Sequence, residues 1–373
     1  MIQMFSNSLG KEELKAIEKV FNSKWLGVGE ETEAFEREFA DKIGSKYALT
    51  YNSCTATLFS SMRILDIGPG DEVLIPSINF LSGAQAIMDC GVEPIFCDVD
   101  PKTLGILPEE IDKKKTKNTK AVMLLHYGGH PCDFDEIVAA CGNITIIEDS
   151  ANSVMSIYKG KHCGTLGDIG CFSFDPMKIL VVGDGGMMTL QDEDLLKKAK
   201  EDRYLGLEQK AKSGLEQLRT ANNTWWGINV VKASGRHITN DICSSVGRIQ
   251  LKKIDSFIEK RRSIWESYKE EFKDLDWLEL PPEPRDYCKS SYYLFWLRIK
   301  NNIRDKFAKY MVDSGIYVTF RYYPLHLVKY YGFKEKLPNS ELANNEMINI
   351  PIHQNLIDSE ISFIIDQIRN FKC

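Results

Sequence analysis

The sequence contains no apolar run that approaches the ~18 residues needed to cross a membrane as a helix. Its opening segment, MIQMFSNSLGKEELKAIEKVF, also lacks the basic and then apolar order of a signal peptide. Ten cysteines are scattered without a CxxC pair, and several, including Cys97 and Cys171, stand within apolar segments, which is typical of reduced core thiols. We therefore expect a cytoplasmic protein with no membrane contact, no disulfide framework and no bound metal.

An excess of basic residues is also missing. The chain has 47 Lys and Arg against 53 Asp and Glu, a formal net charge of −6, so no broad basic face is available for nucleic acid. No GxGxxG motif follows the first predicted strand, which argues against a nicotinamide-dependent reductase. The remaining composition, 43% hydrophobic and 27% charged, is that of an ordinary globular protein with substantial cores.

From about residue 47 to residue 190, short apolar segments alternate with amphipathic ones. Such alternation predicts an α/β fold with a mainly parallel sheet that is buried on both faces. The predicted strands are YALTY (47–51), EVLIP (72–76), VEPIFCDV (92–99), KAVMLLHY (120–127), ITIIEDS (144–150), IGCFSF (169–174) and GGMMTL (185–190). Helices are predicted before and between them, at residues 11–22, 32–43, 55–66, 82–89 and 133–141.

After about residue 200 this alternation stops. A polar, glycine-punctuated excursion at 202–230 precedes a long amphipathic helix at 240–272. Beyond it, predicted strands at 292–299 and 315–323 flank a helix at 304–313. At 373 residues the chain exceeds what one core usually supports, so we predict two domains. These are a large domain over residues 1–250, with the N-terminal helical segment, and a smaller α+β domain over 251–373.

Polar and reactive residues follow several of the predicted strands. Ligands of open parallel sheets gather outside the carboxyl ends of the strands, so these side chains are expected to share one edge. Each has an ordinary structural explanation on its own, such as a helix cap, a core aromatic residue or a solvated lysine. They are Ser53, Cys54 and Thr55 at a helix start, Asn79 and Phe80, His126 and Tyr127, Glu148 and Asp149, and Ser173 with Lys178.

Lys178 stands between apolar segments in DIGCFSFDPMKILVVGDGGMM (168–188). A buried ammonium is costly unless it is paired or neutralised, so this lysine is either a solvated turn residue or a reactive amine. Pyridoxal phosphate requires a lysine for covalent attachment, a carboxylate for its ring nitrogen, a cup for its phosphate and an aromatic face. Lys178, Asp149, the helix start at residues 53–55 and Phe80 together match those requirements.

Nearly end to end, the chain also resembles the DegT/DnrJ/EryC1/StrS family of sugar aminotransferases. The resemblance is most specific in IIEDSANS (146–153) and in GTLGDIGCFSFDPMKILVVGDGGMM (164–188). It extends from WLGVGEETEAFEREFADKIGSKYAL (25–49) to YYPLHL (322–327) and NIPIH (349–353). The resemblance implies the fold type I architecture of aspartate aminotransferase, with a large domain, a smaller α+β domain and pyridoxal 5'-phosphate as cofactor.

The resemblance also implies roles for individual residues. Lys178 matches the lysine that carries the cofactor and shuttles protons, and Asp149 matches the acid that pairs with the pyridine nitrogen. In SGRHITND (234–241), Arg236 is the best match for a residue that reaches the cofactor phosphate from a second subunit. The remaining matches are Asn152 at the ring oxygen, Phe80 on the ring face, Ser173, Cys54 and Thr55 in the phosphate cup, and Arg321 and His326 as substrate contacts in TFRYYPLH (319–326).

The expected function is transfer of an amino group from an amino acid, L-glutamate, to a nucleotide-linked keto sugar, for surface-polysaccharide or amino-sugar biosynthesis. The expected assembly is a homodimer with shared active sites. Three alternatives remain open: a smaller phosphorylated ketone as acceptor, a pyridoxal-phosphate-dependent sugar dehydratase, and a non-catalytic family member. Lys178 argues against the dehydratase, in which histidine replaces the lysine, and the Lys178–Asp149 pair argues against a non-catalytic protein.

Overall fold

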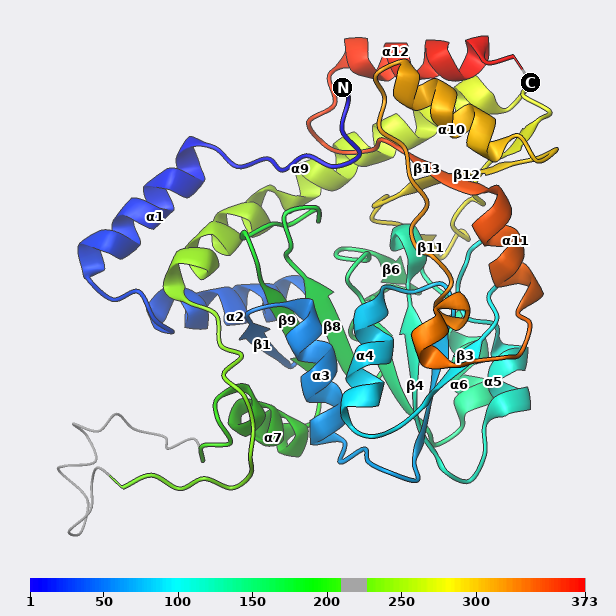
Figure 1. The fold of residues 1–373 in the computed structure, drawn as a ribbon. Coiled ribbons are helices and arrows are strands. Elements are labelled where there is room, and N and C mark those ends of the chain that lie inside the picture. Colours follow the sequence, from blue (N-terminus) through cyan, green and yellow to red (C-terminus); the bar gives the residue numbers. More distant parts are fainter. Residues whose placement is uncertain (209–226, 373) are drawn as a thin grey trace.

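The computed structural model describes residues 1–208 and 227–372 and is built around one seven-stranded sheet (Figure 1). The strand order is β1-β9-β8-β5-β4-β2-β3, and β9 is antiparallel to both of its neighbours, whereas the other neighbouring pairs are parallel. All seven predicted strand segments are found, which confirms the predicted mainly parallel sheet. The strands are β1 (Tyr47–Tyr51), β2 (Glu72–Pro76), β3 (Pro94–Cys97), β4 (Thr119–Leu125), β5 (Thr145–Asp149), β8 (Ile169–Ser173) and β9 (Gly186–Leu190).

Helices cover both faces of this sheet. Because side chains alternate along a strand, Ile147 packs with the cores of α3, α4 and α7, whereas Ile146 packs with those of α5 and α6 on the opposite face. Next to β8, Phe39 of α2 contacts Phe172 of that strand edge to face, with ring centroids 5.1 Å apart. The helices are α2 (Glu30–Ile43), α3 (Cys54–Ile64), α4 (Leu81–Asp89), α5 (Pro108–Lys114), α6 (Phe134–Cys141) and α7 (Glu193–Arg203).

Side-chain caps fix where several helices begin. The Ser53 hydroxyl accepts a hydrogen bond from the Ala56 amide (3.1 Å) at the start of α3. The Asn240 side chain accepts one from the Cys243 amide (2.9 Å) at the start of α9. Such caps satisfy amide groups that the first turn of a helix leaves without partners.

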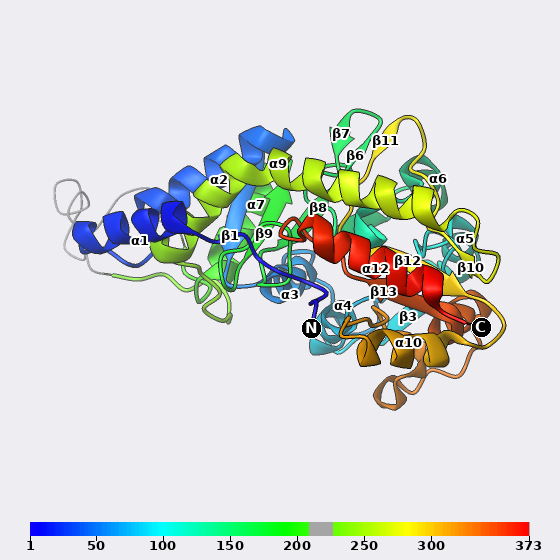
Figure 2. The same ribbon diagram turned by 90° about the horizontal axis from the view of Figure 1, so that it is seen from above.

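The longest helix, α9 (Asp241–Phe272, 32 residues), runs from the sheet to the C-terminal part of the chain (Figure 2). Its first residue, Asp241, accepts hydrogen bonds from the Gly29 amide (2.9 Å) and from the amide and hydroxyl of Thr32 (3.0 and 2.6 Å), which joins it to the start of α2. The helix α1 (Lys11–Ser23) packs beside it, with Glu13 bound to Gln250 and Lys253. The domain boundary expected at residue 250 therefore falls within a continuous helix.

The C-terminal part has its own antiparallel sheet in the order β10-β12-β13, and the N-terminal residues join it through a bridge between Ile2 and Ile316. A third small sheet has the order β11-β6-β7. The strands of the two sheets are β10 (Leu278–Glu279), β12 (Phe295–Ile299), β13 (Met347–Ile350), β11 (Cys288–Lys289), β6 (Ile157–Tyr158) and β7 (Lys161–His162). The other helices of the described residues are α10 (Arg304–Asp313), α11 (Pro338–Glu346), α12 (Asp358–Asn370) and three 3-10 turns, η1 (Tyr127–Gly129), η2 (Leu325–Leu327) and η3 (Lys329–Tyr331).

The prediction of a strand at residues 315–323 is wrong. Only isolated bridges form there, from Ile316 to Ile2 and from Thr319 to Asn349 of the edge strand β13, so the segment touches two partners at single residues without forming a continuous ladder with either. The strand predicted at 292–299 begins only at Phe295, since the amides of Tyr293 and Leu294 donate instead to the Gly128 carbonyl.

The helix predictions at 11–22, 32–43, 82–89, 240–272 and 304–313 are confirmed to within two residues. Most of the predicted excursion at 202–230 lies outside the described residues. None of the helices in residues 1–208 and 227–372 has both the length and the apolar character that a membrane span requires.

Candidate active site

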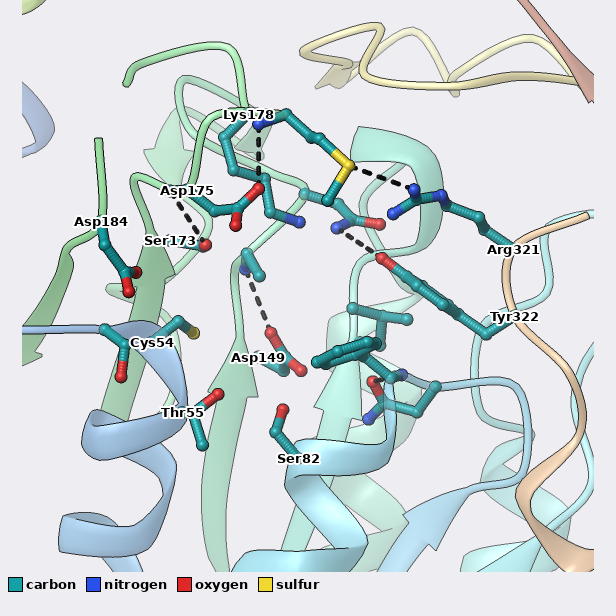
Figure 3. Close-up of a pocket in the computed structure, with 17 residues that line it drawn as sticks. Cys54, Thr55, Ser82, Asp149, Ser173, Asp175, Lys178, Asp184, Arg321 and Tyr322 are labelled. Atoms are coloured by element: carbon teal, nitrogen blue, oxygen red, sulfur yellow. Dashed lines mark hydrogen bonds between the residues drawn. The ribbon is translucent and has the colours of Figure 1, made fainter. Parts of the chain in front are cut away.

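A pocket that opens to solvent lies at the carboxyl ends of the parallel strands (Figure 3). It is bounded by the starts of α3 and α4, the end of β5, the turn after β8, and Arg321 and Tyr322 from the C-terminal part. This is the place where ligands bind in open parallel sheets. The residues that line it are Ser53, Cys54, Thr55, Asn79, Phe80, Ser82, Leu125, Asp149, Ala151, Asn152, Ser173, Asp175, Met177, Lys178, Asp184, Arg321 and Tyr322.

Among the candidates that follow strands, Ser53 and Asn79 line this pocket, whereas His126, Tyr127 and Glu148 do not. Of the ten residues to which the resemblance assigns roles, eight line it and two do not. Arg236 and His326 lie outside it. Those that line it are Cys54, Thr55, Phe80, Asp149, Asn152, Ser173, Lys178 and Arg321.

Lys178 enters the pocket from a turn that Asp175 closes. The Asp175 carbonyl accepts from the Lys178 amide (2.9 Å), and the Asp175 carboxylate accepts from the Met177 amide (2.9 Å). The Lys178 Nζ lies 3.4 Å from the Tyr293 hydroxyl and 4.7 Å from the centroid of its ring. Burial lowers the pKa of the Lys178 ammonium. The nearby Tyr293, Tyr322 and Asp149 raise it by more than burial lowers it, so the pKa stands above its ordinary value.

Asp149 is the last residue of β5 and is only 2% exposed. Burial raises the pKa of its carboxyl to about 6, although the hydrogen bond from the Ala151 amide (3.1 Å) and the charge of Lys178 lower it. The preceding Glu148 faces away from the pocket and accepts hydrogen bonds from His126 (2.9 Å) and from the amides of Gly164, Leu166 and Gly167 (2.7 Å each). These bonds fix the end of β5 and therefore the position of Asp149.

The start of α3 forms an anion cradle beside Ser173. A helix N-terminus presents amide groups and a positive dipole to a bound phosphate, and the Thr55 side chain is exposed at this point. Strand β9 approaches the cradle so closely that a Cβ at Gly186 would lie 2.4 Å from the Ser53 carbonyl carbon. This position therefore requires glycine.

Phe80 and Asn152 lie on the other side of the pocket. The Phe80 ring is 47% exposed and lies 5.8 Å from the Tyr322 ring, so its face is available to a planar ligand. The buried Asn152 amide donates to the Tyr322 hydroxyl (3.5 Å) and accepts from the Gly128 amide (3.4 Å). These contacts orient the amide toward the Tyr322 side of the pocket.

Arg321 forms the rim of the pocket. Its guanidinium lies 4.6 Å from the centroid of the Phe5 ring and contacts the Met177 Sδ (3.3 Å), while its backbone amide donates to Asn349 (2.8 Å). Figure 3 shows the Arg321 side chain above Tyr322, with a dashed line from its guanidinium to a sulfur atom. A cation held against an aromatic ring and a thioether is weakly hydrated and well placed to meet an anionic ligand.

Arg236 lies outside the pocket of its own chain, on an exposed stretch whose neighbours are anchored. Its guanidinium lies 5.6 Å from the centroid of the Tyr204 ring. The adjacent His237 donates its amide to the Arg203 carbonyl (2.8 Å) and accepts from the Asn52 amide (2.8 Å), one residue before the cradle. The segment thus passes beside the cradle while Arg236 points elsewhere.

His326 is buried beneath the pocket wall. Its Nδ1 is 2.6 Å from the Ser77 hydroxyl, and its Nε2 is 3.7 Å from a Glu341 oxygen. Burial lowers the pKa of this imidazole. The environment is that of a structural histidine.

Sequence reasoning missed several residues that shape the pocket, namely Ser82, Asp175, Met177, Asp184 and Tyr322. Asp175 and Met177 closely precede Lys178 in the sequence, and Tyr322 follows Arg321. Their closeness to an identified site residue is the sequence signal that could have predicted them. Tyr293 comes from a segment whose apolar pattern indicates only a strand, and nothing in the sequence ties it to Lys178.

The fold and the pocket together define a pyridoxal-phosphate-dependent aminotransferase. Residues 7–369 match the model of the DegT/DnrJ/EryC1/StrS aminotransferase family, and the chain belongs to that family. It is 42% identical over 371 residues to dTDP-4-dehydro-2,3,6-trideoxy-D-glucose 4-aminotransferase of Saccharopolyspora spinosa, covering 98% of this chain and 96% of that protein. It is 30% identical over 374 residues to GDP-perosamine synthase of Escherichia coli O157:H7, covering 99% and 98%.

A solved structure agrees with these relatives. The aminotransferase TlmJ from Streptoalloteichus hindustanus superposes with a TM-score of 0.93 at 41% identity, covering 99% of this chain and 98% of that one. The predicted fold class and the predicted resemblance are therefore confirmed.

Proposed function

We propose that this protein transfers the amino group of L-glutamate to a nucleotide-linked keto sugar, in the formation of an amino sugar for a polysaccharide or a related product. The observation that carries this proposal is the meeting of Lys178, Asp149 and the cradle at residues 53–55 in one pocket. The two curated relatives named above support the acceptor class, because their names specify dTDP- and GDP-linked sugar chemistry.

The residues of the pocket fit pyridoxal 5'-phosphate. A carboxylate that is 2% exposed, with a pKa raised to about 6, is placed to receive a cationic ring nitrogen, and a helix N-terminus is placed to receive a phosphate. When bound, the cofactor supplies the carbon that accepts and returns the amino group and a ring that withdraws electrons from it. Lys178 would hold it covalently, Asp149 would keep the ring nitrogen protonated, and Phe80 would cover a ring face.

Lys178 has a second role once its amine is free. The Nζ then takes a proton from the substrate carbon that bears the amino group and returns it elsewhere, which is general base and general acid catalysis by one group. The surrounding Tyr293, Tyr322 and Asp149 favour the charged amine, which makes the free amine a stronger base for taking that proton. Arg321 would meet the negative charge of a substrate at the rim.

We also propose that the protein works as a homodimer with shared sites. Arg236 is exposed on an anchored segment and lies outside the pocket of its own chain. A two-fold dimer places the same segment of each copy against the other, so one contact would complete both pockets. Exposed apolar side chains near the N-terminal helices, such as Trp25 (60%) and Phe21 (57%), support an interface there.

A half-reaction screen tests the proposed function. The holoenzyme is converted with L-glutamate to its amine-carrying form, freed of excess donor, and offered dTDP-linked keto sugars, GDP-linked keto sugars or a small phosphorylated ketone. Return of the original absorbance spectrum identifies the acceptor. We expect a nucleotide-linked keto sugar to restore it; restoration by the small phosphorylated ketone alone would overturn the assigned substrate class.

Lys178→Ala is the matched variant for the site, and Lys120→Ala, an exposed lysine on β4 outside the pocket, is its control. The first should fold but lose covalent cofactor attachment, measured by borohydride reduction and peptide mass, and turnover with it. The second should behave as wild type. Attachment of the cofactor to another lysine in Lys178→Ala, with turnover unchanged, would contradict the assigned role.

A further inference from the structure

Tyr293 touches the amine of Lys178, and its hydroxyl is a hydrogen-bond partner of that amine in addition to raising its pKa. Its hydroxyl is 3.4 Å from the Lys178 Nζ, and the ring centroid is 4.7 Å from the same atom. The side chain is fully buried (0% exposed) and does not itself line the pocket. A phenol enclosed beside a reactive amine is a candidate partner for that amine.

The backbone of Tyr293 is fixed on two sides. Its amide donates to the Gly128 carbonyl (2.9 Å), and the neighbouring Ser291 hydroxyl donates to the Asn152 carbonyl (2.8 Å). Gly129, in the turn that receives these residues, has a φ of +87°, and a Cβ there would lie 2.1 Å from the Ser291 hydroxyl. Gly128 and Gly129 thus permit a close approach of the segment from Ser291 to Tyr293, and this approach sets the position of Tyr293 relative to the pocket.

A buried arginine holds the other side. Arg261 of α9 is 1% exposed, and its Nη1 donates to the carbonyls of Tyr292 (3.2 Å), Tyr293 (3.3 Å) and Ile352 (3.0 Å). Its Nε donates to the Gln354 side chain (2.9 Å), and burial lowers the pKa of the guanidinium to about 10. An arginine that is this deeply buried usually pairs with a carboxylate. The Arg261 guanidinium instead binds backbone carbonyls and orders that stretch of backbone.

The ring of Tyr293 is held as well. Phe5, from the N-terminal segment, stacks on it with ring centroids 5.6 Å apart and an interplanar angle of 23°. The backbone contacts and this stack leave the hydroxyl with one orientation toward Lys178. The restraints act on the backbone and the ring, and the hydroxyl at the end of the ring lies 3.4 Å from the Lys178 Nζ.

We infer that Tyr293 is a positioning residue for Lys178. The Tyr293 hydroxyl holds the Lys178 amine in place whenever that amine is not joined to the cofactor. A charged amine donates to the Tyr293 oxygen, and a neutral amine accepts from the Tyr293 O–H, so one hydrogen bond persists in both protonation states without net proton loss. The inference rests on the proposed role of Lys178 and deepens it.

The first experiment uses the full chain freed of cofactor and does not depend on turnover. Tyr293→Phe keeps the ring and the Phe5 stack but removes the hydroxyl; Tyr292→Phe, whose ring packs on Trp265 (5.5 Å) outside the pocket, is the matched control. Each protein is modified with trinitrobenzenesulfonate across a pH series, and the Lys178 peptide is quantified by mass spectrometry. We expect Tyr293→Phe alone to react at lower pH than wild type, because its ammonium has lost a stabilising partner.

The second experiment measures the glutamate half-reaction of the holoenzyme. Tyr293→Phe should lower its maximal rate by about tenfold or more, the loss expected for one hydrogen bond to a charged group, while the KM for glutamate changes little. Melting temperatures near wild type would show that the fold is intact. Tyr293→Phe with wild-type pH dependence of modification and wild-type rate would overturn the inference, whereas cofactor attachment that survives Lys178→Ala would overturn the proposed site instead.

Discussion

At the scale of single residues, burial gives the carboxyl of Asp149 an unusual pKa. Its folded-state pKa, raised to about 6 by burial, is higher than the ordinary value of 3.8. Folding therefore favours the protonated form of Asp149. Its contribution to the unfolding free energy is fully present below pH 3.8 and is lost as the pH rises through about 6. A rise of this size corresponds to about 3 kcal/mol of unfolding free energy.

Asp149→Asn should consequently behave in opposite ways in the empty and the loaded protein. Without cofactor, the variant should gain up to about 3 kcal/mol over wild type at pH 8 and about half of that at pH 5, because the amide removes a buried charge. With cofactor, its turnover should fall by orders of magnitude, since a neutral amide does not hold the ring nitrogen protonated. Denaturant unfolding at both pH values checks the first expectation. An equal stability difference at pH 5 and pH 8 would contradict it.

Arg321 carries a second prediction at this scale. Arg321→Gln should raise the KM for the nucleotide-linked sugar by about tenfold with little change in kcat, because it removes one charged hydrogen-bond donor from the rim. The wild-type KM should rise with salt, and that of the variant should rise less. Arg285→Gln, which removes an arginine bound to Asp133 away from the pocket, is the control. A rise in the KM for glutamate alone would assign Arg321 to the donor instead.

At the scale of secondary structure, the cradle depends on how closely β9 approaches the start of α3. A Cβ at Gly186 would meet the Cys54 amide nitrogen at 2.5 Å and the Ser53 carbonyl carbon at 2.4 Å, and both are backbone atoms that do not rotate aside. Gly186→Ala should therefore displace the first turn of α3. We expect at least a tenfold loss of cofactor affinity and a destabilisation of about 1–3 kcal/mol, the usual cost of overpacking.

The measurement for Gly186→Ala is cofactor titration by fluorescence together with thermal unfolding. Gly68→Ala is the matched control, since a Cβ at Gly68 has no atom within 4 Å. Wild-type affinity in Gly186→Ala would show that β9 does not set the geometry of the cradle.

The same elements show how far the sequence determined the fold. The seven strands of the large sheet are found where apolar segments stand between turn residues, because a strand that is buried on both faces consists mostly of apolar residues. The reversed direction of β9 could not be read from its residues, since an apolar strand looks alike in either direction. The segment 315–323 has the composition of a strand but forms only single bridges, to Ile2 and to Asn349 of β13, which depends on the assembled fold and not on composition.

The site was predictable to the extent that its residues follow strands or helix starts. Lys178, Asp149 and Ser173 are near strand ends in the sequence, and the sheet brings those ends together. Tyr293 was not predictable, because its contact with Lys178 spans 115 positions along the chain and depends on Gly128 and Arg261. His326 matched a motif but lies against Ser77 and Glu341.

At the scale of the whole molecule, the proposed shared site leads to a mixing experiment. In a dimer made of one Lys178→Ala chain and one Arg236→Ala chain, one pocket carries both lesions and the other carries neither. Equal mixing with free subunit exchange should restore about a quarter of wild-type activity, since half of the dimers are mixed and each has one intact pocket.

Two outcomes would contradict the shared site. One is a monomer, by light scattering, at concentrations where turnover is normal. The other is no recovered activity although mass spectrometry of differently labelled chains shows that exchange took place.

The helix α9 has a consequence for how the length of this chain can change in evolution. It is continuous for 32 residues, with Asp241 bound to the start of α2 near one end and Arg261 bound to the Tyr293 carbonyl further along. Each residue of an α-helix advances the rotation by about 100°, so one inserted residue between these anchors would turn Arg261 away from its carbonyls. Insertion of about seven residues restores the angle but displaces the far anchor by about 10 Å. The spacing of the two anchors is therefore closed to insertion and deletion, although no residue between them has to touch the pocket.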